Sequence, residues 1–314
     1  MNFDRSLPLA VLRSAALTLL LSGGTAHAQK KIIIGYTAVP DFAAAFIAKE
    51  RGFFEKRKLN VELQLITLTS SIPPAVMSDS IQIGGTTPPV LLQAVDSGLD
   101  LVALASGSTY DNTKGYVNVV ARASSGIKTA QDLVGKKFGV PGLGGTLHVL
   151  LRRWLTEKGV DPKRVTFIEV PLPQIGDVLR GGSIDAAVTV EPFVGRIVQT
   201  QAGVVVPGFS TDTPSGFANV LYVATRKWAT ANGAEVKAFR EALAEAIAFA
   251  NSNREEAYVE LGKYFKVPPP VLKATPWPNL VVDLTDAQMR FWTDTMRSQD
   301  MLKKPPMVSS LIVK

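Results

Sequence analysis

Cysteine is absent from the 314-residue sequence. This absence excludes disulfides, thiolate metal ligands, cysteine nucleophiles and a lipid anchor attached through a cysteine. Histidine is scarce, and His27 lies in the N-terminal segment, which leaves His148 as the single imidazole beyond it. We therefore expect no metal site of the usual His and Cys type and no His-dependent nucleophilic catalysis.

The sequence also lacks an apolar run of the ~20 residues that a membrane-spanning helix needs. The short run at 14–21 follows two arginines and precedes the small residues of Ala-His-Ala at 26–28. This order is typical of a cleaved export signal. We expect residues 1–28 to be a signal peptide cleaved after Ala28. The mature chain should then lie in the periplasm without inserting into the membrane.

Charged residues make up 19% of the chain and apolar residues 46%, which is a globular composition. The formal net charge is +7, but the positive residues are scattered in short groups without interleaved aromatic residues. This pattern indicates solvated faces and argues against nucleic-acid binding. The length exceeds what one hydrophobic core holds comfortably, so we expect two lobes.

Strand patterns alternate with helical patterns along most of the chain. The expected strands lie at 32–36, 60–66, 81–84 and 101–105 in a first set and at 137–140, 165–170, 184–190 and 203–206 in a second. Short links between strands and helices predict parallel sheets that are covered on both faces. Residues 117–121 and 220–225 resemble strands that cross between the two sets. From residue 234 onward the pattern is helical, which predicts a cap on the first lobe.

We therefore expect an α/β protein of two lobes joined by two chain crossings. The first lobe should comprise residues 29–116 and 221–314, including the helical cap, and the second lobe residues 117–220. Ligands of open α/β sheets bind beyond the carboxyl ends of the strands. Two such edges that face each other across a hinge form a cleft that can close on a ligand.

Hydroxyl residues and one carboxylate follow the strands of the predicted first lobe. Hydroxyl and backbone N–H groups at helix starts suit a carboxylate, a sulfonate or the polar edge of a ring, although each residue could instead be a simple helix cap. Tyr110 could stack on a flat ligand. The candidates for ligand binding in this lobe are Thr37, Asp41, Thr69, Ser70, Thr86, Thr87 and Tyr110.

A glycine loop at 142–146 separates a strand from a helix in the predicted second lobe. Its glycines would let the backbone approach a ligand, and the helix N-terminus would offer free N–H groups. Leu147 stands where the dinucleotide fingerprint needs its third glycine, and no Gly-Lys-Ser/Thr follows, so the loop is not a P-loop. Gly144, Gly145 and Thr146 are ligand candidates; the alternative is a tight turn with Thr146 as a helix cap.

Glu191 follows a buried strand and precedes Pro192, which should start a helix. A carboxylate at this strand end could bind an amine or N–H group of the ligand. Alternatively, it could form a bond across the hinge in the closed state, for example to a backbone N–H group. His148 could reach the cleft, although a lone histidine on a helix is more often structural.

Four stretches of the sequence resemble, in order, the motifs of one family. They are AKERGFFEK with LNVEL at 48–63, IQIG with TTPP at 81–89, DLVGKKFGVP at 132–141, and LRGGSIDA with VEPF at 179–193. The family is the substrate-binding proteins of ABC importers, in the nitrate, sulfonate, taurine and thiamine-pyrimidine-precursor (NMT1-like) group. The resemblance covers residues 30–225.

The resemblance implies a type II-like periplasmic-binding-protein fold, with two mixed sheets flanked by helices and a two-strand hinge. It implies no catalytic residues, no cofactor, a small-molecule ligand and a membrane permease as partner; we expect a monomer. The ligand would be a small organic anion, a zwitterion or a heterocycle. No arginine stands in an evident cleft loop, which weakens the case for a simple anion. A two-lobed enzyme of the pyrimidine-precursor synthase type and a periplasmic sensor are the alternatives.

Overall fold

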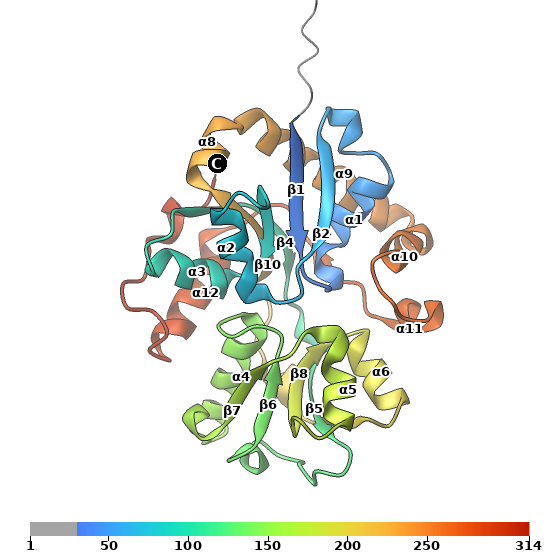
Figure 1. The fold of residues 1–314 in the computed structure, drawn as a ribbon, viewed down its shortest axis with the longest axis vertical. Helices are drawn as coiled ribbons and strands as arrows, with labels where there is room; N and C mark the ends of the chain where they lie inside the picture. The colour runs from blue at the N-terminus through green and yellow to red at the C-terminus, as the bar shows by residue number, and fades with distance from the viewer. Residues whose placement is uncertain (1–29, 314) are drawn as a thin grey trace, which may run out of the picture.

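The computed structural model describes residues 30–313, so the expected signal peptide and its cleavage site lie outside the described residues. The described chain forms two α/β lobes, each a sheet flanked by helices, stacked one above the other in Figure 1. We call the part built on the six-stranded sheet the first lobe and the part built on the five-stranded sheet the second lobe. This architecture confirms the predicted fold class.

The first lobe has the strand order β11-β4-β10-β3-β1-β2. Strands β1, β2 and β3 run parallel to one another, whereas β10 lies antiparallel between β3 and β4. Every residue of β4 is buried, because β10 pairs along its length and helices α3 (Pro88–Asp96), α8 (Arg226–Ala231) and α9 (Gly233–Ser252) pack against it. The strands are β1 (Lys31–Tyr36), β2 (Asn60–Leu65), β3 (Ile83–Thr86), β4 (Leu101–Thr109), β10 (Ala218–Thr225) and β11 (Asn279–Leu280).

The second lobe has the strand order β7-β6-β8-β5-β9. Strands β6, β7 and β8 are parallel, and β5 pairs antiparallel with both β8 and β9. The strands are β5 (Val117–Arg122), β6 (Lys137–Val140), β7 (Thr166–Glu169), β8 (Ala186–Val190) and β9 (Gly203–Val206). The helices are α4 (Thr146–Glu157), α5 (Ile175–Arg180), α6 (Phe193–Gln199) and α7 (Phe209–Asp212).

The two lobes are joined by two chain crossings that pair with each other. The Tyr110 N–H group donates to the Phe217 carbonyl at 3.0 Å, and the Gly216 N–H group donates to the Tyr110 carbonyl at 2.8 Å. The two rings stack with centroids 5.0 Å apart. The returning strand β10 begins at Ala218, where it pairs with Thr109 of β4, somewhat earlier than the sequence pattern indicated.

The remaining helices belong to the first lobe. Helices α1 (Ala43–Glu50), α2 (Ile72–Met77) and α3 (Pro88–Asp96) link its strands, and α9 and α10 pack against α1 while α12 packs against α3. Figure 1 shows these late helices, in orange and red, around the upper sheet. They are α8 (Arg226–Ala231), α9 (Gly233–Ser252), α10 (Arg254–Gly262), α11 (Pro269–Ala274) and α12 (Asp286–Arg297).

The C-terminal part departs from the sequence expectation in one respect. We expected only helices there, but the short strand β11 joins the edge of the first sheet next to β4. Two residues are too few to show a strand period in the sequence. None of the helices within residues 30–313 combines the length and the apolar character that crossing a membrane requires.

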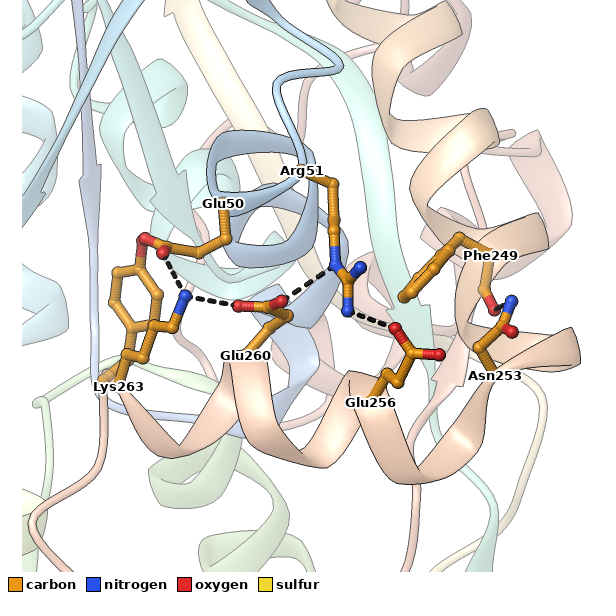
Figure 2. Close-up of polar contacts among 8 residues, drawn as sticks. Glu50, Arg51, Phe249, Asn253, Glu256, Glu260 and Lys263 are labelled. Atoms are coloured by element: carbon orange, nitrogen blue, oxygen red, sulfur yellow. Dashed lines mark hydrogen bonds and ion pairs between the residues drawn. The ribbon is translucent and has the colours of Figure 1, made fainter.

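An ion-pair network attaches α10 to the end of α1 (Figure 2). Arg51 reaches Glu256 at 2.6 Å and Glu260 at 2.8 Å, and its guanidinium lies 4.4 Å from the centroid of the Phe249 ring. Lys263 bridges Glu260 and Glu50, at 2.6 Å from each. The Glu260 side chain is only 8% exposed, and these two cations are its ion-pair partners.

We predict that Arg51→Ala lowers the free energy of unfolding by about 1–3 kcal/mol, because it leaves the buried Glu260 carboxylate with Lys263 alone. Urea denaturation measures this change. Arg180→Ala is the control, because its pair with Asp177 is exposed on both sides and should contribute less than about 1 kcal/mol. Equal losses for the two variants would contradict a structural role for the network.

Candidate functional site

A cleft between the facing strand ends is lined by residues of both lobes. It holds about 700 Å³ of empty space, including the part that is open to solvent. Its polar side chains are Thr37, Asp41, Thr67, Thr69, Thr87, Thr146 and Asn219. Its larger apolar side chains are Val39, Leu65, Leu147, Leu172, Val190 and Val220.

The cleft lies where the sheets end, because parallel strands place their carboxyl ends at one edge. Thr37 follows β1, Thr67 follows β2, and Thr87 follows β3. In the second lobe, Pro141 follows β6 and Val190 ends β8. The hinge turns these two edges toward each other.

The lobes already touch across the cleft. The Thr146 hydroxyl of the second lobe donates to the Asn219 carbonyl of the first at 3.1 Å. A Cβ atom placed on Gly142 would lie 3.1 Å from the Thr69 Cβ, and one on Gly144 would lie 2.3 Å from the Gln93 Oε1. The structure is therefore in a closed arrangement.

These contacts give two glycines of the loop a role besides the expected one. We expected the glycines to let the backbone approach a ligand; in this structure Gly142 and Gly144 also let it approach the opposite lobe. Gly144 has a φ of +76°, which favours glycine, and it does not line the cleft. Gly145 and Thr146 do line it, and Thr146 is the first residue of α4 rather than its cap.

Asp41 is a carboxylate buried at the junction of cleft and hinge. It lies in the short 3₁₀ helix Pro40–Phe42 before α1 and is 1% exposed. Its Oδ1 accepts hydrogen bonds from the Ser108 hydroxyl at 2.5 Å, the Asn219 amide at 2.9 Å and the Tyr116 hydroxyl at 3.4 Å. Burial raises the pKa of Asp41, and these hydrogen bonds oppose the rise.

Five of the predicted site residues lie off the cleft lining. Ser70 and Gly144 neighbour lining residues, and Thr86 is buried within β3. Tyr110 is 2% exposed and stacks on Phe217 in the hinge, where no face of its ring is open to a ligand from the cleft. The fifth residue is Glu191.

Glu191 is half-buried, and its carboxylate makes its hydrogen bond within its own lobe rather than across the hinge. Its Oε2 accepts a hydrogen bond from the Gly195 N–H group at 2.9 Å, within the first turn of α6. Burial raises the pKa of Glu191, and the Gly195 hydrogen bond opposes this. In this structure the Glu191 carboxylate accepts a hydrogen bond from one of the backbone N–H groups that the first turn of α6 leaves without a helical partner.

The sequence analysis did not single out Asn219, which connects the site to the hinge. Asn219 lies at the start of β10, and its amide donates to both Asp41 and the Tyr116 hydroxyl. The feature of the sequence that could have indicated its role is a polar residue at the start of a strand that crosses between the lobes. The apolar walls from Leu65, at the end of β2, and Leu172, in a short 3₁₀ helix, were also missed, because an apolar residue at the end of an element looks like a core residue in the sequence.

His148 of α4 is hydrogen-bonded to the backbone of the glycine loop that precedes this helix. Its Nδ1 accepts a hydrogen bond from the Gly144 N–H group at 2.9 Å, and its ring packs edge-on against Phe167 at 4.6 Å. Burial, together with the nearby Arg152, lowers the pKa of His148 from 6.5 to about 4. The imidazole is therefore neutral at neutral pH and serves the loop as an acceptor.

We predict that this histidine makes the protein sensitive to acid. Below pH 6.5 the unfolded chain binds a proton that the folded chain accepts only near pH 4. The free energy of unfolding should therefore fall by about 3 kcal/mol over this interval. His148→Asn keeps an acceptor and removes this titration, so its unfolding curves should change less between pH 6.5 and pH 4. Parallel pH profiles for the two proteins would contradict the assignment.

Two α/β lobes, a two-strand hinge and a cleft between facing strand ends define the periplasmic-binding-protein fold. A solved structure supports this class: the alkanesulfonate-binding protein SsuA from Xanthomonas axonopodis bound to MOPS, with a TM-score of 0.76, 20% identity and coverage of 91% of this chain and 99% of that one. The chain belongs to the NMT1/THI5-like family, which matches residues 39–257.

Two relatives illustrate the range of this family. A putative aliphatic sulfonates-binding protein of Escherichia coli is 29% identical over 72% of this chain and 69% of its own length. A putative thiamine biosynthesis protein of Haemophilus influenzae is 31% identical over 50% of this chain and 48% of its own length. The chain thus spans about half the length of the Haemophilus relative.

Proposed function

We propose that this protein is the periplasmic substrate-binding component of an ABC importer. It captures a small organic molecule between its lobes and delivers it to a membrane permease. The observation that carries the proposal is the cleft between the facing strand ends, which is lined from both lobes with the lobes in contact around it. A ligand in this cleft would touch both lobes at once and so favour the closed arrangement.

The comparisons support a binding role for this chain. Relatives and structural neighbours are named for the sulfonates or nitrate that they bind. The chemistry of the cleft agrees with binding rather than turnover. Among the residues that line it, all within the described part of the chain, Asp41 is the one titratable side chain. A nucleophile paired with a base, which covalent catalysis needs, is not present in that set.

A pyrimidine-precursor synthase is the second candidate, since the family name and the Haemophilus relative point to thiamine biosynthesis. The fate of the bound compound distinguishes the two functions. A binding protein returns its ligand unchanged after prolonged incubation, and it stimulates uptake by its permease in reconstituted vesicles. Chemical conversion of the bound compound, detected by mass spectrometry, would favour the enzyme. Binding without stimulated uptake by the permease would contradict the transport role.

We predict that Gly142→Val prevents full closure, because its side chain would meet Thr69 across the cleft. Overpacking of this kind costs about 1–3 kcal/mol, which corresponds to a loss of affinity of ~5- to 140-fold. The φ of Gly142 is not in the left-handed region, so the loop itself tolerates a side chain. Titration calorimetry measures the affinity, and small-angle scattering should give a larger radius of gyration with ligand bound.

Gly233→Val is the matched control, since a Cβ there meets nothing within 4 Å. This variant should bind ligand with wild-type affinity, and its radius of gyration with ligand bound should equal that of the wild-type protein. If Gly142→Val also bound and closed like the wild-type protein, the contact between the glycine loop and Thr69 would not belong to the bound state.

A further inference from the structure

The charge of the cleft points to the kind of ligand. Among its lining residues, which all belong to the described part of the chain, Asp41 is the one with an ionisable side chain. Lysine, arginine and histidine are missing from that set. An anion enclosed here would face a buried carboxylate without a lining cation to compensate either charge.

The Asp41 carboxyl is held in place by side-chain donors to one of its two oxygens. Donors from Ser108, Asn219 and Tyr116 all converge on Oδ1, while no side chain of residues 30–313 donates to Oδ2. These three partners come from β4, from β10 and from the segment that enters β5, so they fix Asp41 against the hinge. An ionised carboxylate has capacity for further donors at its second oxygen.

The rest of the cleft suits an uncharged body. Its walls include Leu65, Leu172 and Val190, and its hydroxyl groups can accept as well as donate. The Thr87 hydroxyl is buried at the cleft without a hydrogen-bond partner in the described structure. Such an orphaned group is satisfied when a ligand with a polar atom occupies the site.

We propose that the ligand presents a nitrogen-bound hydrogen-bond donor to Asp41, carried on a compact apolar body. The donor is a protonated amine or amidine, or the N–H group of an uncharged heterocycle. The site therefore discriminates against sulfonates and nitrate, unlike the sites of the relatives that are named for these anions. This inference rests on the proposed binding function and concerns the same cleft.

Matched compounds test the inference on the unaltered protein. Benzamidine is compared with benzenesulfonate, butylamine with butanesulfonate, and aminopyridine with benzoate, within wider collections of amines, amino-heterocycles, sulfonates and carboxylates. Thermal shift finds the binders and calorimetry ranks them. The nitrogen compounds should bind at least tenfold more tightly than their acidic counterparts. Tighter binding of the sulfonates or carboxylates would overturn the inference while leaving the binding function intact.

Absence of binding by every compound in both collections would instead count against the proposed function, and the inference would fall with it. The two failures are therefore distinguishable. A scattering measurement of the radius of gyration with each binder adds a second readout, because a compound that occupies the cleft should keep the lobes closed.

Asp41→Asn tests the residue itself. The amide has the same shape and can still accept from Ser108 and Asn219, but it carries no charge and presents its own N–H group. The best nitrogen ligand should lose at least tenfold in affinity, and its sulfonate counterpart should gain. Asp283→Asn is the control: it removes one negative charge from a side chain of the first lobe that is 90% exposed, and should leave both affinities unchanged.

Unchanged affinity of the nitrogen ligand for a folded Asp41→Asn protein would overturn the role of Asp41. The melting temperature of the variant shows whether it is folded. If it does not fold, the ranking of the matched compounds on the wild-type protein still decides the inference.

Discussion

The pairing of the two chain crossings is the constraint on which the molecule depends. Tyr110 forms backbone hydrogen bonds with Gly216 and Phe217, and its ring stacks on that of Phe217, so the two crossings lie side by side. Trp292 of α12 supports the crossings, since its indole N–H group donates to the Ala218 carbonyl at 2.7 Å. Because the chain passes between the lobes at this one place, rotation about the paired crossings is the motion that would change the distance between the facing strand ends.

The hinge and the cleft share their polar groups. Asp41 lines the cleft, and its Oδ1 also connects Ser108, Tyr116 and Asn219, which lie along the crossings. A ligand that contacts Asp41 would therefore act directly on the residues that set the angle between the lobes. On the opposite side, His148 keeps the glycine loop in the shape that meets the first lobe. The candidate site and the contact between the lobes thus share buried polar groups, since Asn219 bonds both Asp41 and Thr146.

Much of this organisation could be predicted from the sequence. The alternation of strands and helices gave the two lobes, because short links between such elements allow few other arrangements. Hydroxyl residues after strands, such as Thr37 and Thr87, were placed in the cleft by the rule that ligands meet the carboxyl ends of parallel strands. The start of β10 and the existence of β11 were harder to predict from the sequence, since short apolar segments do not mark where strand pairing begins.

The parts of the site that escaped prediction depend on tertiary contacts. Glu191 has a suitable position in the sequence, but the first turn of α6 supplies it with the Gly195 N–H group. The glycines at 142 and 144 indicate a close approach, although the sequence does not tell whether a ligand or the other lobe approaches. Asn219 gains its importance from Asp41 and Tyr116, which are more than a hundred residues away.

The most direct test of this account is the distance between the lobes in solution. Because the chain contains no cysteine, a cysteine at the exposed position of Glu62 and another at that of Asp177 can carry a specific pair of dyes. Single-molecule energy transfer should show a broad population without ligand that shifts to one short distance when the cleft is occupied. A tightly bound ligand that leaves the distance distribution unchanged would contradict the account.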